Sequence, residues 1–142
     1  MEPTGPVSVD VRVNYSQTDH MGVVYHARYL VWLDIARTDL LRQAGMSYRE
    51  LEALGFRLVV ADLSVRYRQA ARYDDAVRVR CWVRELASRR VTFGYALEHA
   101  ETGRLLATAT TAMLALDASM SPTRLPDAVR ALLNPISDPV RI

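Results

Sequence analysis

The sequence of 142 residues has a single cysteine, Cys81, and only three histidines. One cysteine excludes an internal disulfide, and three scattered histidines do not give the spacing of a metal-ligand cluster. We therefore expect no metal site. A free cysteine usually behaves as a small buried hydrophobe. Cys81 lies within a strand-like segment, so we expect it to be buried rather than nucleophilic.

Lysine is absent, and all eighteen basic residues are arginines, set against sixteen acidic residues for a net charge of +2. The arginines are interspersed with acidic residues, which disfavours a nucleic-acid-binding protein. No apolar run approaches the roughly 18 residues that a membrane span needs, and the first ten residues lack the basic and apolar regions of a signal peptide. The sequence predicts a cytoplasmic protein, without a membrane span and without nucleic acid as a partner.

The length and the absence of linkers or repeats predict one domain, residues 1–142. Within it, five segments alternate apolar and polar residues or carry the β-rich composition that is typical of strands. A short loop containing Gly103 separates the last two and predicts a hairpin. The predicted strands are 7–15, 63–68, 77–83, 90–99 and 104–116.

A long helix is predicted over residues 27–44, which contain no proline or glycine before Gly45 provides a stop. Its apolar face is broader than a surface helix requires, so we expect the sheet to wrap round it. Asp34 and Arg37 fall inside this face, three residues apart, and are expected to pair. A second helix at 47–54, capped by Ser47, and a short turn at 127–133 complete an α+β fold. The residues of the expected apolar face are Tyr29, Leu30, Leu33, Ala36, Leu40, Leu41 and Ala44.

The loop before the long helix carries the chemistry. A helix start has unpaired backbone N–H groups and the positive end of the helix dipole, so it attracts an oxyanion. Asp19 precedes such a start by one loop, and it can therefore face the same reacting carbonyl as the amides near Tyr25 and His26. A simpler interpretation stays open, in which Asp19 only caps a turn.

Several motifs resemble the hotdog-fold acyl-CoA thioesterases, specifically the 4-hydroxybenzoyl-CoA thioesterase and YbgC-like branch. The resemblance covers nearly the whole chain, but Asp34 stands where many relatives carry glutamate, and the family varies the position of His20-Met21. The matching residues are Tyr15, Thr18-Asp19, Gly22-Val23-Val24-Tyr25-His26, Tyr29-Leu30, Ala36-Arg37, Tyr67-Arg68, Tyr73-Asp74-Asp75 and the run Pro122 to Pro126.

The resemblance implies a hotdog fold, a curved antiparallel five-stranded sheet wrapped round one long central helix. It implies hydrolysis of an acyl-CoA or acyl-carrier-protein thioester by Asp19, acting either as general base on water or as nucleophile. A backbone N–H near His26 would polarise the carbonyl oxygen. The His26 side chain would bond the thioester or Asp19, and Tyr15 would orient the carboxylate or line the acyl pocket.

For the substrate, the resemblance implies binding by Gly22, Val24 and Tyr25, with coenzyme A as part of the substrate and no separate cofactor. Arg89, Arg90 and Arg124 lie in loops where they can meet its phosphates, although each also suits a solvated surface. The resemblance further implies a homo-oligomer, a dimer or a dimer of dimers, with active sites between subunits.

Two other functions remain as alternatives. A hotdog dehydratase or hydratase would also bind acyl thioesters, but the H-F-P-G and G-D-x-N-P-x-H motifs are absent. A non-catalytic partner in a lipid-synthesis complex would bind acyl-CoA or acyl carrier without cleaving it. Such a binder has no use for an unpaired carboxylate beside the thioester, so Asp19 favours the hydrolase.

Overall fold

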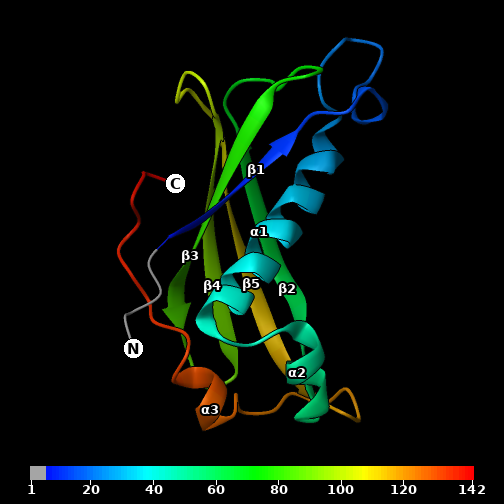
Figure 1. Cartoon of the computed structure of the whole chain (residues 1–142). Coiled ribbons are helices and arrows are strands. Elements are labelled where there is room, and N and C mark those ends of the chain that lie inside the picture. Colours follow the sequence, from blue (N-terminus) through cyan, green and yellow to red (C-terminus); the bar gives the residue numbers. More distant parts are fainter. Residues whose placement is uncertain (1–5) are drawn as a thin grey trace.

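The computed structural model describes residues 6–142, and residues 1–5, at the start of the predicted domain, lie outside them. Five antiparallel strands form one sheet in the order β1-β3-β4-β5-β2, and one long helix, α1, crosses its face (Figure 1). This confirms the predicted α+β fold class. The strands are β1 (Val7–Arg12), β2 (Phe56–Tyr67), β3 (Ala76–Leu86), β4 (Arg90–His99) and β5 (Leu105–Asp117).

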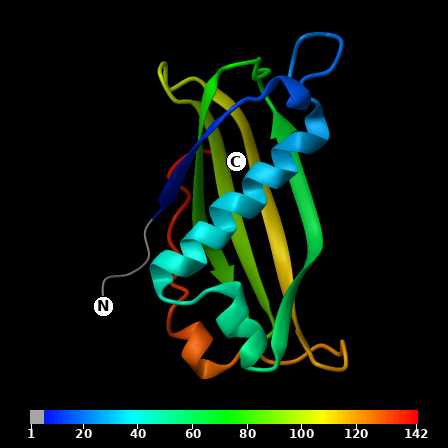
Figure 2. The ribbon, with the colours of Figure 1, turned by 45° about the vertical axis from the view of Figure 1, so that its right-hand side comes forward.

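The helices are α1 (Tyr29–Ala44), α2 (Tyr48–Ala53) and α3 (Asp127–Arg130). Gly45 ends α1 in the left-handed conformation, at φ 109°, and the Ser47 side chain accepts the N–H of Glu50 at the start of α2. Both signals were read correctly from the sequence. Figure 2 shows α1 lying diagonally across the concave face of the sheet, while α2 and α3 lie at the end of the sheet opposite the β1–α1 loop.

Strand β2 is longer than the predicted segment 63–68, because it begins at Phe56. A β-bulge between Val60 and Asp62 shifts the register against β5. Alternation therefore breaks in the middle of the strand, and the first half reads as an apolar run without a clear period. β1 is shorter than predicted, since the chain turns into a 3₁₀ helix, η1 (Tyr15–Gln17).

The buried face of α1 differs from the predicted one at three positions. Trp32 is buried although it was not predicted in this face, whereas Leu30 is 36% exposed and Asp34 is also exposed. Arg37 is buried, as predicted. The guanidinium of Arg37 donates to the hydroxyls of Tyr95 and Tyr48, at 3.1 and 3.3 Å, and to Asp34 at 2.6 Å.

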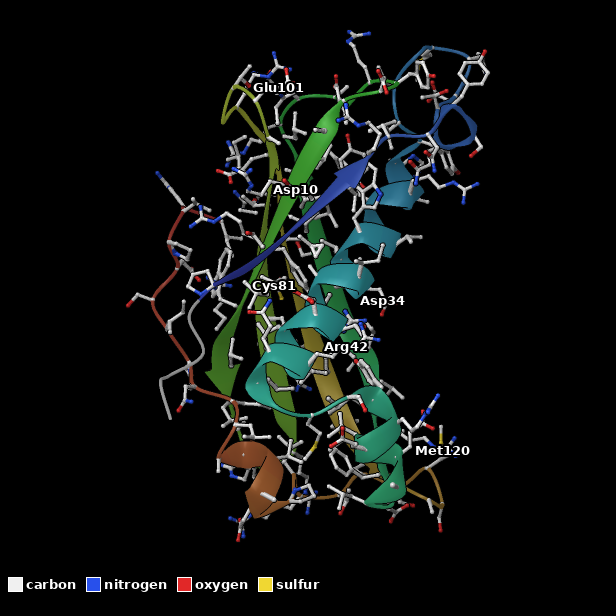
Figure 3. All side chains as sticks on the ribbon, in the orientation of Figure 1. Asp10, Asp34, Arg42, Cys81, Glu101 and Met120 are labelled. Carbon is white, nitrogen blue, oxygen red and sulfur yellow. The ribbon has the colours of Figure 1, made fainter. Side chains whose placement is uncertain are left out.

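The Asp34–Arg37 pair therefore forms as expected, but the prediction that Asp34 is buried was wrong. Its side chain is 63% exposed, and it projects from α1 as Figure 3 shows, whereas that of Arg37 is 7% exposed. Because i and i+3 positions diverge by about 60° round a helix, one member of the pair reaches the rim while the other stays inside.

Cys81 is fully buried on β3, and burial raises the pKa of its thiol, so it is inert as predicted. Among residues 6–142, no group of His, Cys, Asp and Glu has the arrangement of a metal site. No helix in the same range is long and apolar enough to cross a membrane. The cytoplasmic location stays a prediction.

Because Asp34 is exposed and Arg37 is buried, we expect a definite order of stability among three variants of this pair. Asp34→Ala leaves the buried Arg37 guanidinium with neutral partners only, so we expect it to lower the free energy of unfolding by about 1 to 3 kcal/mol. Arg37→Leu should cost less, because Asp34 remains in water and the Tyr95 hydroxyl keeps its 2.7 Å bond to Thr111. The double variant should resemble Arg37→Leu. Urea denaturation of all three would contradict this placement if Arg37→Leu were the most damaging.

Candidate active site

The loop between β1 and α1 contains a tight hairpin that carries Asp19. Thr18 and Val24 form an isolated antiparallel bridge, and the N–H of Asp19 donates to the carbonyl of Val23 at 2.9 Å. Gly22 has φ +82°, a conformation that other residues adopt at a cost, so its place in the motif is explained by the turn. Only a few residues after Asp19, the loop contacts the β2–β3 connection through Val23 and Val24.

The half-buried Asp19 carboxylate makes one hydrogen bond and leaves one oxygen free. Oδ1 accepts the N–H of Met21 at 2.8 Å, which is an Asx turn. No hydrogen bond between residues 6–142 reaches Oδ2. Oδ1 of Asp19 therefore caps a turn, as the simpler interpretation predicts. Oδ2 remains available to a water molecule or a carbonyl carbon.

A short 3₁₀ helix, η2 (His26–Arg28), leads into α1 and supplies the helix-start amides. The N–H of Tyr25 is already bonded to the carbonyl of Gln17 at 2.9 Å, so it is not free for a substrate. The first N–H groups of a helix have no partner within it. No hydrogen bond to the rest of chain 6–142 occupies the N–H of His26 or Ala27. These two amides are the candidate oxyanion donors.

The side chain of His26 is exposed and stacks among aromatic rings. Its imidazole lies 4.5 Å from the ring of Tyr25 and 6.5 Å from that of Tyr67, between centroids. Within the described chain it makes no hydrogen bond to Asp19. Among residues 6–142, the structure therefore shows no contact that joins the side chains of His26 and Asp19.

The side chain of Tyr15 is exposed and packs against a residue of the β2–β3 connection. It is 77% exposed, and its ring packs edge-on against Tyr73 at 5.6 Å. Its backbone carbonyl accepts the Thr18 hydroxyl at 2.7 Å, which braces the loop. Among residues 6–142, Tyr15 makes no hydrogen bond to Asp19, and it is not one of the residues that line the cavity described below.

A cavity of about 190 Å³ lies between the helix start and the end of β2. Of the residues predicted from the sequence as site residues, Val24 and His26 line it, while Asp19, Tyr15, Gly22 and Tyr25 do not. The remaining lining comes from the first residue of α1, the end of β2 and the β2–β3 connection. Its residues are Val24, His26, Tyr29, Tyr67, Arg68, Gln69 and Ala70.

Two tyrosines that line the cavity, Tyr29 and Tyr67, form hydrogen bonds between its walls. The Tyr29 hydroxyl accepts the N–H of Ala71 at 3.0 Å, and burial, opposed in part by this bond, raises the pKa of Tyr29. The Tyr67 hydroxyl donates to the carbonyl of His26 at 2.7 Å. Sequence reasoning missed both as site residues, although Tyr29 and the Tyr67-Arg68 pair belong to the motifs that carry the family resemblance.

The arginines considered for the coenzyme A phosphates lie elsewhere in the chain. Arg89 is in the β3–β4 turn and Arg90 is the first residue of β4, at the far end of β3 from the cavity, and Arg124 pairs with Asp127 at 3.5 Å. Arg68 instead lines the cavity.

Comparison with known proteins places this geometry in a family. The model of the thioesterase-like superfamily matches residues 13–133. The acyl-CoA thioesterase YbgC of Haemophilus influenzae is 36% identical over 126 residues, covering 87% of this chain and 91% of that protein. The acyl-CoA thioester hydrolase YbgC of Escherichia coli O6:H1 is 34% identical over 122 residues, covering 85% and 90%.

Solved structures agree with the fold. The DHNA-CoA thioesterase of Staphylococcus aureus superposes with a TM-score of 0.80 at 31% identity, covering 84% of this chain and 80% of that one. A hypothetical protein of Thermus thermophilus gives 0.84 at 36% identity, covering 89% and 95%. Because the family model spans strands β2 to β5, the central helix and the Asp19 loop, this chain belongs to the thioesterase-like superfamily of hotdog proteins.

Proposed function

We propose that this chain hydrolyses the thioester bond of an acyl-CoA or acyl-carrier-protein substrate, with Asp19 as the reacting group. Family membership makes it a thioester hydrolase, and the relatives named as acyl-CoA thioesterases support the substrate class. The observation that carries the proposal is the free oxygen of Asp19 in a loop that leads directly into the two unbonded amides of His26 and Ala27.

Two chemical routes fit this arrangement. As a general base, Asp19 takes a proton from water, the hydroxide adds to the carbonyl carbon, and the C–S bond breaks as the proton passes to the leaving thiolate. As a nucleophile, a carboxylate oxygen displaces the thiolate directly, and water then cleaves the mixed anhydride. In both routes the helix-start amides stabilise negative charge on the carbonyl oxygen. Coenzyme A enters as part of the substrate, and no separate cofactor is needed for either route.

The role proposed for the His26 side chain is to contact the substrate rather than Asp19. Its ring lies over the cavity with Tyr67, and the two rings are nearly perpendicular, at 87°. Gly22 and Tyr25 would contribute to substrate binding by setting the shape of the loop. Tyr15 would stabilise the loop through its backbone carbonyl. A non-catalytic binding role, or a dehydratase, finds no separate support in these contacts.

We also propose that the active unit is a homodimer at least, joined at β2. This strand is an edge of the sheet, and its twelve residues leave one row of backbone groups unpaired. Apolar side chains are exposed beside this edge and on the outer face of α1, and the cavity opens at the end of the same strand. A second copy would therefore cover them and complete the wall of the site. The exposed residues are Leu30, Val31, Ile35, Val60, Leu63 and Tyr67.

Asp19→Asn is the direct test of the chemistry. The amide oxygen still accepts the N–H of Met21, so the loop should keep its shape, but the base and the nucleophile are lost. We expect kcat on a cleaved acyl-CoA to fall by about 10² to 10⁴. Asp127→Asn, an exposed carboxylate on α3, is the matched control and should hydrolyse normally. Turnover above half the wild-type value for Asp19→Asn would remove Asp19 from the mechanism.

The assembly is tested by light scattering over a dilution series. We expect a dimer or tetramer for the wild type, and a shift toward monomer for Leu63→Arg, which places a charge on the exposed part of β2. Leu54→Arg, at a residue that is also exposed but lies at the end of α2, should leave the assembly unchanged. An active wild-type monomer at every concentration would show that the site does not need a second copy.

A further inference from the structure

Tyr67 joins the end of β2 to the start of the central helix. Its hydroxyl donates to the carbonyl of His26 at 2.7 Å, although the two residues are 41 positions apart in the chain. Its ring packs edge-on against Tyr29, with centroids 5.1 Å apart and planes at 88°. Tyr67, Tyr29 and His26 all line the cavity beside the helix-start amides. This hydrogen bond is therefore made at the site itself and not in the remote core.

The bond acts on a peptide group that carries one of the free amides. A trans peptide is planar, and its C=O and N–H point in opposite directions. A hydrogen bond that holds the His26 carbonyl therefore fixes the direction of the Ala27 N–H on the other side of the same plane. Hydrogen bonds in a chain also polarise one another, so the carbonyl bond makes this N–H a stronger donor.

Tyr67 is suited to this role because it stays a donor. Burial raises the pKa of its phenol, and the neighbouring Tyr29 raises it further. The hydroxyl is therefore protonated near neutral pH, whereas a phenolate would only accept hydrogen bonds. The His26 carbonyl needs a donor.

We propose that Tyr67 is a positioning residue for thioester hydrolysis, one that holds the first turn before α1 so that the N–H of Ala27, next to that of His26, faces the substrate carbonyl. This inference rests on the proposed function, because it assigns those amides to the oxyanion of the same reaction. Tyr67 acts through the backbone of His26 and transfers no proton itself.

The test is Tyr67→Phe, which keeps the ring contacts and removes only the donor. We expect kcat to fall about 5- to 100-fold, as for a misplaced catalytic group, while KM changes less than about twofold. A second readout needs no substrate, because amide hydrogen exchange in residues 24–30 should become faster. Tyr73→Phe is the matched control. Its hydroxyl has no hydrogen bond to residues 6–142, and it should change neither kcat nor exchange.

The outcomes separate this inference from the proposed function. If Asp19→Asn is inactive and Tyr67→Phe keeps the wild-type kcat, the hydrolase stands and the role of Tyr67 is overturned, whether or not exchange becomes faster. A loss of thermal stability with kcat and KM changed together would also overturn it, since that is a structural effect. If Asp19→Asn stays active, the proposed function itself is overturned, whatever the result for Tyr67→Phe.

Discussion

The hydrogen bonds between the β2–β3 connection and the loop before α1 are the constraint on which the site depends. Ala71 takes part in two of them, since its carbonyl accepts the N–H of Val24 at 2.9 Å and its N–H donates to the Tyr29 hydroxyl at 3.0 Å. Arg72 forms a bridge with Val23 beside them. Ala71, which is fully buried, thus joins both the Asp19 loop and the first turn of the helix to the β2–β3 connection.

The sheet in turn fixes the helix. Trp32, Leu33 and Leu40 are almost wholly buried, and Arg37 anchors the middle of α1 to Tyr95 on β4. Packing of this kind resists small shifts, because a core at crystal-like density has few alternative arrangements. The helix start therefore reaches the loop at a set position. The free oxygen of Asp19 and the two free amides are local groups held by this larger framework.

The elements were largely predictable from sequence, because alternation, Gly45 and the Ser47 cap are local signals. Where prediction fell short, the cause was non-local. The β-bulge interrupts the alternation of apolar and polar residues in β2, so the first half of the strand was not predicted. The exposure of Asp34 depends on which part of α1 the sheet covers. The motif predicted a helix start one loop after Asp19, and the 3₁₀ helix η2 does begin there, at His26. The bond from Tyr67 to His26 joins residues 41 positions apart, so no local pattern contains it.

The central claim is that one thioester carbonyl lies between the Asp19 carboxylate and the amides of His26 and Ala27. It is tested most directly by a crystal structure of the protein with an acyl-CoA analogue whose thioester sulfur is replaced by a methylene group, which binds without being cleaved. The account predicts the ketone oxygen at about 3 Å from one or both amide nitrogens, with Oδ2 of Asp19 facing the carbonyl carbon. A ketone bound away from these amides, with Asp19 bonded only to its own turn, would contradict it.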